Sequence, residues 1–591
     1  MGQFFKFVLA SCLGIFIAML LLFGVGIMVL AGIASSAEKP VKVSPNTVLR
    51  ITLEKPVPEK TNNLEMATFD LKETKVLGLS DILKLIEKAK NDDNIKGILL
   101  ETDMISTGLS TASVLREAIL DFKSSGKFVI AYSDYYSQGA YFMASAADQV
   151  FVNPLGGVDF IGFAAEVPFF KNMLDKLGIK AQVYYAGKFK SATEPFRRTN
   201  MSDENRLQTR AYLDEIYRIF LDEISRSRGV SVGELRKVAD TNFGLNADEA
   251  KKFKLVDAIG YRDEALSLIR QKMGLDADDK IRTTTLEDYF KSSPISSGYS
   301  GKNKIAVVYA EGTLVDGKGE YGSIGDDRYV KIIEKIRKDD DIKAMVLRVN
   351  SPGGSAMSSE NIWREMTLLK QAGKPIVVSM GDYAASGGYY IACIGDSIVA
   401  EPNTITGSIG VFSLIPSVQR LMNDKIGINF DTVKTAKFAQ GLSILYDMSE
   451  EEGRMLQVRT DQIYETFLKR VSEGRGMSRD QVHEIAQGRV WTGTKAKQLG
   501  LVDELGGLDK ALEIAAGMAG LEDYRTTEYP RTKDPIEQLL EEFTNTDTEE
   551  VQMQRILKTQ LNDWYPYYKM LKEMQDSKGI QARMPHIIKF N

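Results

Sequence analysis

The serine at position 386 has surroundings that suit covalent chemistry. It lies between Ala385 and Gly387, shortly after the apolar run Pro375 to Met380, which is typical of a buried strand. If Gly387 opens a helix, its backbone N–H joins the free amides at the helix start, where the amides and the helix dipole favour negative charge. One interpretation is a nucleophilic serine beside a stabilised tetrahedral intermediate. The other is an ordinary N-cap serine.

A second glycine cluster could supply further amides to the same site. The run Ala344 to Asn350 predicts a buried strand, and Ser351-Pro352-Gly353-Gly354 follows it directly. Proline and two glycines end the strand and leave backbone N–H groups bare. We therefore predict an oxyanion hole from the amides of Gly353, Gly354 and Gly387. Taken alone, the cluster also fits a plain turn.

A histidine is a poor candidate for the base. The chain has two histidines, His483 and His586, and neither lies in a glycine-rich or strand-turn context. A Ser-His-Asp triad would have to use one of them. We expect both to be surface residues, so the base must be another side chain.

The elements that would position these residues occur twice, about 247 residues apart. Asn94-Ile95-Lys96 recurs as Asp341-Ile342-Lys343, and Arg228-Gly229-Val230-Ser231 recurs as Arg475-Gly476-Met477-Ser478. Such a repeat predicts two similar domains in tandem. Short β-rich runs alternate with helix-like segments in each copy, which favours the α/β class.

The first copy lacks the serine. Aligning Gly139-Ala140-Tyr141 with Gly387-Gly388-Tyr389 puts Gln138 at the position of Ser386. The corresponding loop, Met104 to Gly108, also lacks the Pro-Gly-Gly cluster. Only the second copy therefore holds a nucleophile with its amides.

The second copy lacks a lysine that the first copy has. Aligning Lys188-Phe189 with Lys437-Phe438 puts Lys190 opposite Ala439. A lysine accepts a proton only when it is neutral, and its ordinary pKa near 10.4 is too high for that role at neutral pH. Burial between the two repeats would lower the pKa. We predict that Lys190 is the general base for Ser386, whereas the lysine shared by both copies is structural or solvated.

The N-terminus predicts a membrane segment. No charged residue lies between Lys6 and Glu38, and this stretch exceeds the ~20 apolar residues that cross a bilayer. We predict a transmembrane signal anchor; the alternative is a cleavable signal peptide ending near Ser35-Ser36-Ala37. Lysines on both sides leave the orientation open on charge alone.

The chain of 591 residues is expected to hold four parts. These are the anchor at residues 1–45, the first repeat at 46–290, the second repeat at 300–525 and a C-terminal tail at 526–591. Helical spacing of Ile536, Leu539, Leu540 and Phe543 predicts that the tail is helical.

Composition excludes several classes of partner. A net charge of -5 disfavours nucleic acid, which requires clustered positive surface. Only two cysteines occur, Cys12 and Cys393, so neither a disulfide framework nor a cysteine-ligated zinc is expected. The serine and lysine chemistry needs no metal or cofactor.

Three segments together resemble the signal peptide peptidase A family in its long tandem form. They are Asn350-Ser351-Pro352-Gly353-Gly354, Ala385-Ser386-Gly387-Gly388-Tyr389 and Phe189-Lys190-Ser191-Ala192, and the resemblance spans about residues 46 to 520. It implies that Ser386 is the nucleophile and Lys190 the base. It also implies that Ser408, in Thr406-Gly407-Ser408-Ile409-Gly410, orients the lysine, although a turn serine is equally compatible.

The resemblance further implies the fold, the location and the substrate. We expect two tandem Clp/crotonase-like domains of the ββα superhelix type after the transmembrane helix. We expect a homotetramer in the bacterial inner membrane, with its catalytic body facing the periplasm, that degrades cleaved signal peptides as a serine endopeptidase. A crotonase-like acyl-CoA enzyme and a non-catalytic membrane scaffold remain alternatives. A body outside the cytosol would exclude the first, and complementary retention of Lys190 and Ser386 argues against the second.

Overall fold

The computed structural model describes five continuous ranges of the chain, together with Gly14, Phe16 and Met19 as isolated helical positions: 43–61, 76–292, 301–319, 322–531 and 580–584. Among these residues no helix has both the length and the apolar character needed to span a bilayer. The predicted anchor falls almost wholly outside the described residues, so it stays a prediction.

The first repeat is built on a parallel six-stranded sheet of order β8-β4-β3-β2-β1-β9. Its strands are β1 (Thr47–Ile51), β2 (Ile95–Glu101), β3 (Phe128–Ser133), β4 (Gln149–Val152), β8 (Ala258–Ile259) and β9 (Arg282–Thr285). Parallel strands need helices on both faces of the sheet. The helices of this repeat are α2 (Leu79–Asn91), α3 (Leu109–Lys123), α4 (Gln138–Ala144), α7 (Asp203–Arg228), α8 (Val232–Thr241), α9 (Ala247–Lys252), α10 (Arg262–Met273) and α11 (Leu286–Ser292).

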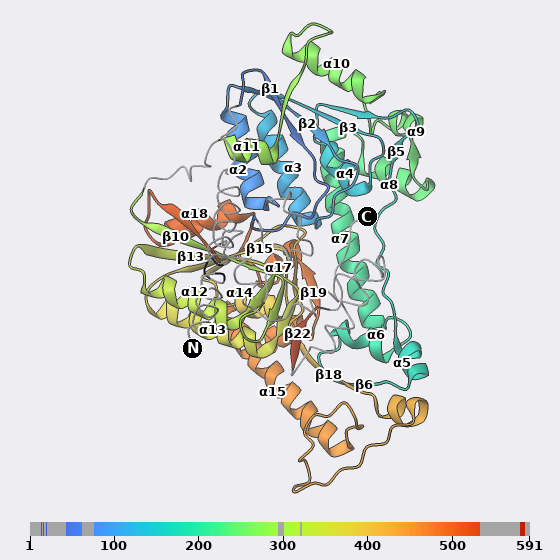
Figure 1. The fold of residues 1–591 in the computed structure, drawn as a ribbon, viewed down its shortest axis with the longest axis vertical. Helices are drawn as coiled ribbons and strands as arrows, with labels where there is room; N and C mark the ends of the chain where they lie inside the picture. Colours follow the sequence, from blue (N-terminus) through green and yellow to red (C-terminus); the bar gives the residue numbers. More distant parts are fainter. Residues whose placement is uncertain are drawn as a thin grey trace, which may run out of the picture.

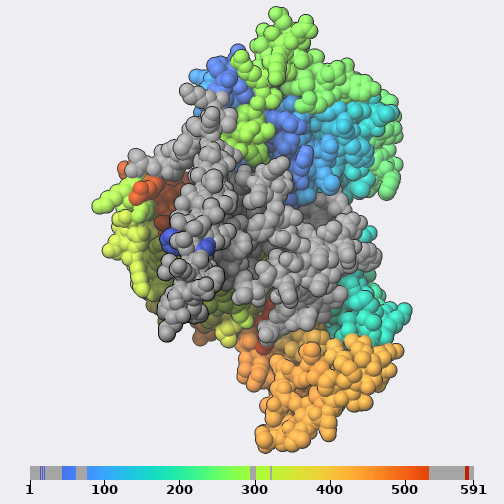
Figure 2. All heavy atoms as spheres, viewed as in Figure 1, coloured from blue at the N-terminus to red at the C-terminus, as the bar shows by residue number. Residues whose placement is uncertain are grey.

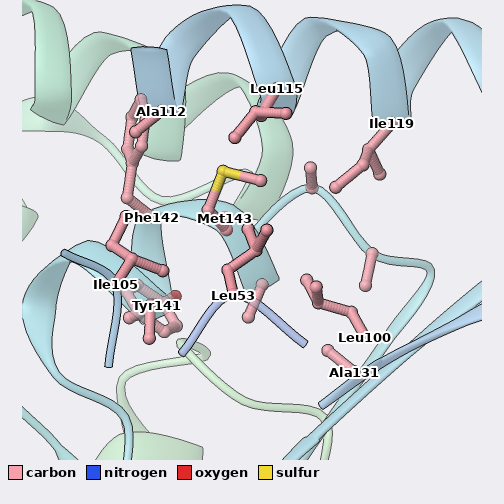
Figure 3. Packing of buried hydrophobic residues seen from close by; sticks show 14 of the residues in the cluster. Leu53, Leu100, Ile105, Ala112, Leu115, Ile119, Ala131, Tyr141, Phe142 and Met143 are labelled. Atoms are coloured by element: carbon pink, nitrogen blue, oxygen red, sulfur yellow. The ribbon is translucent and has the colours of Figure 1, made fainter. Parts of the chain in front are cut away.

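The two faces of this sheet carry separate apolar clusters. On one face, strand residues such as Leu100 and Ala131 pack against Leu115 and Ile119 of α3, as Figure 3 shows. On the other face, Ile269 of α10 packs with residues of β1, β2 and β3. The alternating strands and helices of the sequence therefore produce a layered α/β unit.

The second repeat has an equivalent sheet of order β19-β17-β15-β13-β10-β21, in which β16 also pairs with β15, and β20 pairs with β16. Its strands are β10 (Lys304–Glu311), β13 (Ile342–Ser351), β15 (Ile376–Ala385), β16 (Ser397–Ala400), β17 (Ile405–Gly407), β19 (Val490–Thr492), β20 (Glu504–Leu505) and β21 (Arg525–Tyr529). Its helices are α12 (Asp326–Lys338), α13 (Ala356–Gln371), α14 (Gly387–Ala392), α15 (Glu450–Arg475), α16 (Arg479–Ile485), α17 (Gly493–Gln498) and α18 (Leu508–Met518). The prediction of two α/β repeats in tandem is therefore confirmed.

A third sheet joins distant parts of the chain, in the order β12-β11-β14-β22-β18-β6. Strands β11 (Thr313–Val315), β12 (Ser323–Gly325), β14 (Gly353–Ser355) and β18 (Val411–Ser417) come from the second repeat, whereas β6 (Lys180–Ala186) comes from the first and β22 (Gln581–Arg583) from the C-terminus. Figure 1 shows β6, β18 and β22 close together at the lower edge of the second repeat. A small pair, β5 (Gly157–Val158) with β7 (Leu245–Asn246), lies in the first repeat.

The two longest helices are bounded alike, which reflects the duplicated sequence. Helices α7 and α15 each have 26 residues. Ser202 and Ser449 cap their first amides, and Gly229 and Gly476 end them in the left-handed conformation that glycine adopts without a Cβ clash. Local signals thus set the same boundaries in both repeats.

The described parts of the C-terminal tail are strands. Residues 526–529 belong to β21, which pairs with β10, and residues 581–583 form β22. Pairing with a neighbouring strand satisfies their backbone groups without any helix. The residues that carry the helical prediction lie within 532–579, outside the described residues.

Candidate active site

Ser386 occupies a strained turn between β15 and α14. Its φ of 56° is in the region that residues with a Cβ rarely adopt, and it is the N-cap of α14 although its side chain caps no amide. Its backbone is held by its own N–H, which donates to Gly407 O at 2.8 Å, and by Tyr390 N, which donates to Ser386 O at 2.8 Å. The ordinary N-cap interpretation is therefore wrong, and the side chain is free for another role.

Lys190 reaches this serine from the first repeat. It directly precedes η1 (Ser191–Thr193), and its Nζ donates to Ser386 Oγ at 2.7 Å. The side chain is only 1% exposed. Burial alone lowers the pKa of Lys190 well below its ordinary value, because no described carboxylate lies near enough to oppose the desolvation. The structure thus places a lysine that favours the neutral amine against the serine hydroxyl.

Ser408 provides the other contacts of the Lys190 amine. Nζ donates to Ser408 O at 3.1 Å and to Ser408 Oγ at 3.2 Å. A neutral amine has two N–H groups and one lone pair. When Ser408 accepts both N–H groups, the lone pair is left for the hydroxyl of Ser386. Ser408 has a φ of 50° and donates its own N–H to Arg489 O at 2.7 Å, so it is fixed in place.

The three predicted oxyanion glycines lie together beside Ser386. A Cβ added to Gly353 would be 2.8 Å from Gly387 N, and one added to Gly387 would be 3.2 Å from Gly354 N. Gly353 and Gly354 have φ values of 101° and 156°, which strain any other residue. The turn thus requires glycine at these positions. It brings Gly354 N close to Gly387, whereas Gly353 N donates to Ser351 Oγ at 3.2 Å.

Strand β22 lies against this glycine loop, which the sequence did not reveal. It pairs antiparallel with β14, with Ala582 opposite Gly354, and Met584 N donates to Pro352 O at 2.7 Å. Ala582 is fully buried. A Cβ on Gly353 would come within 2.1 Å of Ala582 O, and one on Gly387 within 3.1 Å. An extended segment therefore fits with its carbonyl between the two glycines, and no local signal in the tail indicates this.

The first repeat fills the corresponding position with its own side chain. Gln138 Oε1 accepts from Ile161 N at 3.1 Å and from Gly162 N at 2.9 Å, and its Nε2 donates to Gly162 O at 3.0 Å. Gln138 is buried. These amides are thus satisfied internally, as expected for a copy without a nucleophile.

A buried ion pair positions the strand ends around the site. Arg348 of β13 makes a bidentate contact with Glu59 of the first repeat, at 2.9 and 3.2 Å, and also donates to Met380 O. Asn350 Nδ2 donates to Glu59 Oε1, and Asn350 Oδ1 accepts from Tyr383 N. Strands β13 and β15 are thereby held at the points where the glycine loop and the serine turn begin. No local sequence pattern indicates Glu59, because the pair joins residues 289 positions apart.

Gly488 is another contact of the site that sequence reasoning missed. A Cβ there would be 2.6 to 2.7 Å from the backbone and Cβ of Lys190. Its N–H donates to Ile409 O at 2.7 Å, which ties it to the Ser408 turn. Its neighbour Gln487, also at positive φ, accepts from Phe189 N. The pair Gln487-Gly488 predicts a turn, but it does not predict that this turn contacts Lys190.

His483 takes no part in this arrangement. Its Nδ1 lies 3.0 Å from Tyr464 Oη, on the partly exposed surface of α15 and α16. His586 is outside the described residues. Within the described chain, we also find no group of three or more potential metal ligands.

Comparison with known proteins fits this geometry. Residues 121–276 and 368–522, one stretch in each repeat, match Peptidase family S49. The chain is 34% identical over 555 residues to "Protease 4" of Salmonella typhi, covering 92% of this chain and 89% of that protein. It is 37% identical over 444 residues to "Protease 4" of Haemophilus influenzae, covering 74% and 72%. It is 31% identical over 521 residues to "Serine protease SPPA, chloroplastic" of Arabidopsis thaliana, covering 87% and 75%.

The chain therefore belongs to peptidase family S49, and it is a serine peptidase. The predicted relationship to signal peptide peptidase A is confirmed by these relatives, and the acyl-CoA enzyme and the scaffold are set aside.

Proposed function

We propose that this chain is a membrane-anchored serine endopeptidase that degrades released signal peptides with a Ser386-Lys190 dyad. The observation that carries the proposal is the 2.7 Å contact between Lys190 Nζ and Ser386 Oγ, in a buried site whose desolvation favours the neutral amine. The name "Putative signal peptide peptidase SppA" of an Enterococcus faecium relative, 34% identical over 240 residues, supports the substrate class.

In the first half of the reaction, Ser386 Oγ attacks the carbonyl carbon of a peptide bond while its proton passes to Lys190 Nζ. The amides of Gly387 and of the Gly353-Gly354 loop hold the negative charge that develops on the carbonyl oxygen. Lys190 then gives the proton to the leaving amine, and the carbonyl carbon remains bound to Oγ as an acyl-enzyme.

In the second half, Lys190 takes a proton from a water molecule, which attacks the acyl carbon. The same amides stabilise the second oxyanion, and the proton returns to Ser386 Oγ as the acid product leaves. In both halves of the reaction, Ser408 accepts hydrogen bonds from Lys190 Nζ and so keeps the amine oriented towards Ser386.

The substrate is proposed to bind as an extended strand beside β14, in the position that β22 occupies. Backbone pairing with a sheet edge binds peptides of varied sequence, whereas side-chain pockets set preference. Ala582 is a small residue that is fully buried at this position, which suits a substrate with small side chains next to the bond that is cut.

The parts of the chain are proposed to divide this work. The segment 1–45 anchors the chain, and the repeats at 46–290 and 300–525 supply the base and the nucleophile from tandem domains of the Clp/crotonase type. We further propose that four chains form a homotetramer on the bacterial inner membrane, with the body in the periplasm. Protease added to intact spheroplasts should then digest the body; protection until the membrane is opened would place it in the cytosol.

Active-site labelling tests the chemistry directly. A fluorophosphonate probe should modify the wild-type chain at Ser386, identified by mass spectrometry of the labelled peptide. The Ser386→Ala and Lys190→Ala chains should remain unlabelled, whereas Lys188→Ala should be labelled like wild type. Labelling at another serine would overturn the assignment.

A further inference from the structure

We propose that Thr111 of the first repeat and Asp382 of the second form a positioning pair that holds the catalytic serine turn. Through this pair the first repeat aligns Ser386 as well as supplying Lys190. The inference rests on the proposed Ser386-Lys190 dyad, and it adds two residues that act on the dyad through the backbone. It is carried by a helix cap that one repeat provides for the other.

Helix α3 of the first repeat begins without a cap of its own. Its N-cap is Gly108, which has no side chain to accept from the free amides, and its first turn holds no acidic residue. Asp382 of β15 takes this role, because its two carboxylate oxygens accept from Thr111 N at 3.0 Å and from Thr111 Oγ1 at 2.7 Å. Thr111 is the third residue of α3, whose amide an N-cap side chain ordinarily binds. The second repeat therefore caps a helix of the first.

The equivalent helix of the second repeat, α13, caps itself. It follows Ser355, whose Oγ accepts from Ser358 N at 3.2 Å. The repeat puts Ser355 at the position of Gly108 and Ser358 at the position of Thr111. A Cβ added to Gly108 would be 2.2 Å from Asp382 Cγ. Glycine thus leaves the space that the carboxylate of the other repeat occupies, and a serine at this position would displace that carboxylate.

Asp382 lies in a bulge of β15, directly before the serine turn. The pairing of β13 with β15 shifts register between Val349 and Ser351, so that residues 381–383 stand against a single residue of β13. Bulges bend a strand and re-aim the side chains that follow, and they are frequent beside active sites. This bulge leads through two alanines to Ser386. The position of the nucleophile therefore depends on how the bulge is held.

Each of the three bulge residues has an anchor. Gly381 O accepts from Thr404 Oγ1 at 2.7 Å, and Tyr383 N donates to Asn350 Oδ1 at 3.1 Å. Both of these anchors come from the second repeat. The anchor of Asp382, in the middle of the bulge, comes from α3. The first repeat thus takes part in fixing the strand that presents the nucleophile.

The same turn of α3 also holds the next strand of the site, β17. Ser110 Oγ donates to Asn403 Oδ1 at 2.8 Å, and Asn403 Nδ2 donates to Ser113 Oγ at 3.0 Å. Asn403 comes shortly before β17, which ends at Gly407 and is followed by Ser408. Figure 1 shows α3 next to β15 at the junction of the repeats, and Figure 2 shows most of the first repeat (blue to green) above the second (yellow to red). One helix turn therefore contacts both strands that lead into the site.

The first repeat has the same aspartate without this contact. The alignment of the two serine-turn positions puts Asp134 at the position of Asp382. Asp134 is exposed, and it accepts from Tyr132 Oη at 2.7 Å and from Asn153 Nδ2 at 2.9 Å within its own repeat. The residue type is thus common to both copies. The contact with a helix of the other repeat occurs in the copy that has the nucleophile.

Loss of the pair should let the bulge relax and move the serine turn. Ser386 keeps its positive φ only while the surrounding structure holds it. A displacement of about 1 Å between reacting groups costs roughly 10²-fold in rate. The edge of β14, where the substrate is proposed to bind, does not contact the pair. The loss should therefore appear in kcat rather than in KM.

Asp382→Ala in the full-length chain tests the pair. It should lower kcat for peptide hydrolysis and the rate of fluorophosphonate labelling at Ser386 by about 10²-fold each, with KM near that of wild type. Asp134→Ala is the matched control, because that aspartate is exposed in the repeat without a nucleophile, and it should react at the wild-type rate. An Asp382→Ala chain with the kcat of wild type would overturn the proposal.

A second variant separates positioning from simple capping of the helix. Asp382→Ala combined with Gly108→Ser gives α3 the cap that Ser355 gives α13, in the space that the carboxylate leaves. Thermal unfolding should then return towards that of wild type, while kcat stays low. Recovery of both together would mean that Asp382 only stabilises the helix, and would refute the positioning role.

Milder changes at Thr111 keep the test decisive if Asp382→Ala does not fold. Thr111→Val removes the hydroxyl but keeps the amide, so it should lower kcat by about tenfold. Thr111→Ser restores the hydroxyl and should recover most of that loss. Equal kcat values for the valine and serine variants would contradict the pair.

Labelling of the wild-type chain distinguishes failure of this inference from failure of the dyad. Absence of label at Ser386 in wild type would refute the dyad and the pair that rests on it. Label at Ser386 in wild type, with the same labelling rate in Asp382→Ala, would refute the positioning pair and leave the dyad in place.

Discussion

The serine turn of the second repeat and its counterpart in the first share a sequence frame but differ in backbone and in partners. Ser386 precedes α14 at a φ of 56°, whereas Gln138 is the first residue of α4, after a Ser137 cap with an ordinary φ of -61°. Gln138 satisfies neighbouring amides with its own side chain, whereas Ser386 leaves the nearby glycine amides to other groups.

This difference shows that the first repeat keeps a relaxed turn whose amides the Gln138 side chain satisfies, whereas the second repeat keeps backbone strain at Ser386. Backbone strain is a cost that persists at functional sites, where it is part of the mechanism. The lysine shows the opposite distribution, because Lys190 of the first repeat is buried, whereas its counterpart in the second repeat is the exposed Ala439. The two repeats thus divide one site.

The largest expected effect comes from removing either half of the site. Ser386→Ala and Lys190→Ala should each lower kcat by roughly 10⁴-fold or more, and the double variant should be no worse, because residues that act as one unit are non-additive. Peptide hydrolysis by the purified chains measures this. Lys188→Ala is the control, since both repeats have a lysine there, and it should retain most activity. A further large loss in the double variant would mean that the two residues act separately.

The pH profile should show a lysine that works in its neutral form. Burial lowers the pKa of Lys190, so the amine is a base above that pKa and an ammonium below it. We expect kcat/KM to be constant above this pKa and to fall by about tenfold for each pH unit below it. The profile of the wild-type chain tests this, with circular dichroism at each pH to exclude unfolding. A rate that rises as the pH falls would contradict a lysine base.

Removing the side-chain amide of Gln138 in the first repeat should lower stability but leave peptide hydrolysis unchanged. Gln138→Ala leaves the part-buried N–H groups of Ile161 and Gly162 without their acceptor, at a cost of about 1 to 2 kcal/mol in unfolding free energy. Urea unfolding measures the loss, and peptide hydrolysis below the transition should stay near wild type. Gln271→Ala, an exposed change on α10, should alter stability by less than about 0.5 kcal/mol. A loss of hydrolysis as large as for Ser386→Ala would show that the repeats do not divide the roles.

The smallest expected effect is the relief of strain at the serine turn. Ser386→Gly should be more stable than Ser386→Ala by about 1 kcal/mol, because only glycine adopts a φ of 56° without a Cβ clash. Both variants should be inactive, and their thermal unfolding gives the difference. If alanine were the more stable, the positive φ would not be a source of strain.

Much of the fold and of the site followed from the sequence. The repeat predicted two α/β units, and capping serines with closing glycines set the ends of α7 and α15 in both. Comparison of the halves identified Ser386 and Lys190 because each is present in one copy only. These features are encoded locally, or in the repeat itself, so they can be read without coordinates.

Other features depend on residues that are distant in the chain. The position of β22 beside Gly354 joins segments more than 220 residues apart, and the tail residues before it carried a helical prediction instead. Likewise, the contact of Glu59 with Arg348 has no local signal. Strand pairing and buried ion pairs are decided by what the rest of the chain brings near, so sequence patterns alone could not supply them.

The sequence by itself determined which residues could react and which copy holds each of them. Only the tertiary structure decided that Lys190 is buried, that Ser386 is strained and that the pairing of β6 with β18 brings the two side chains within 2.7 Å. The physical reason is that desolvation and backbone strain are properties of the surroundings. The residue type sets what a lysine can do, whereas packing of the segment around β6 against β18 sets the pKa of Lys190 and its partner.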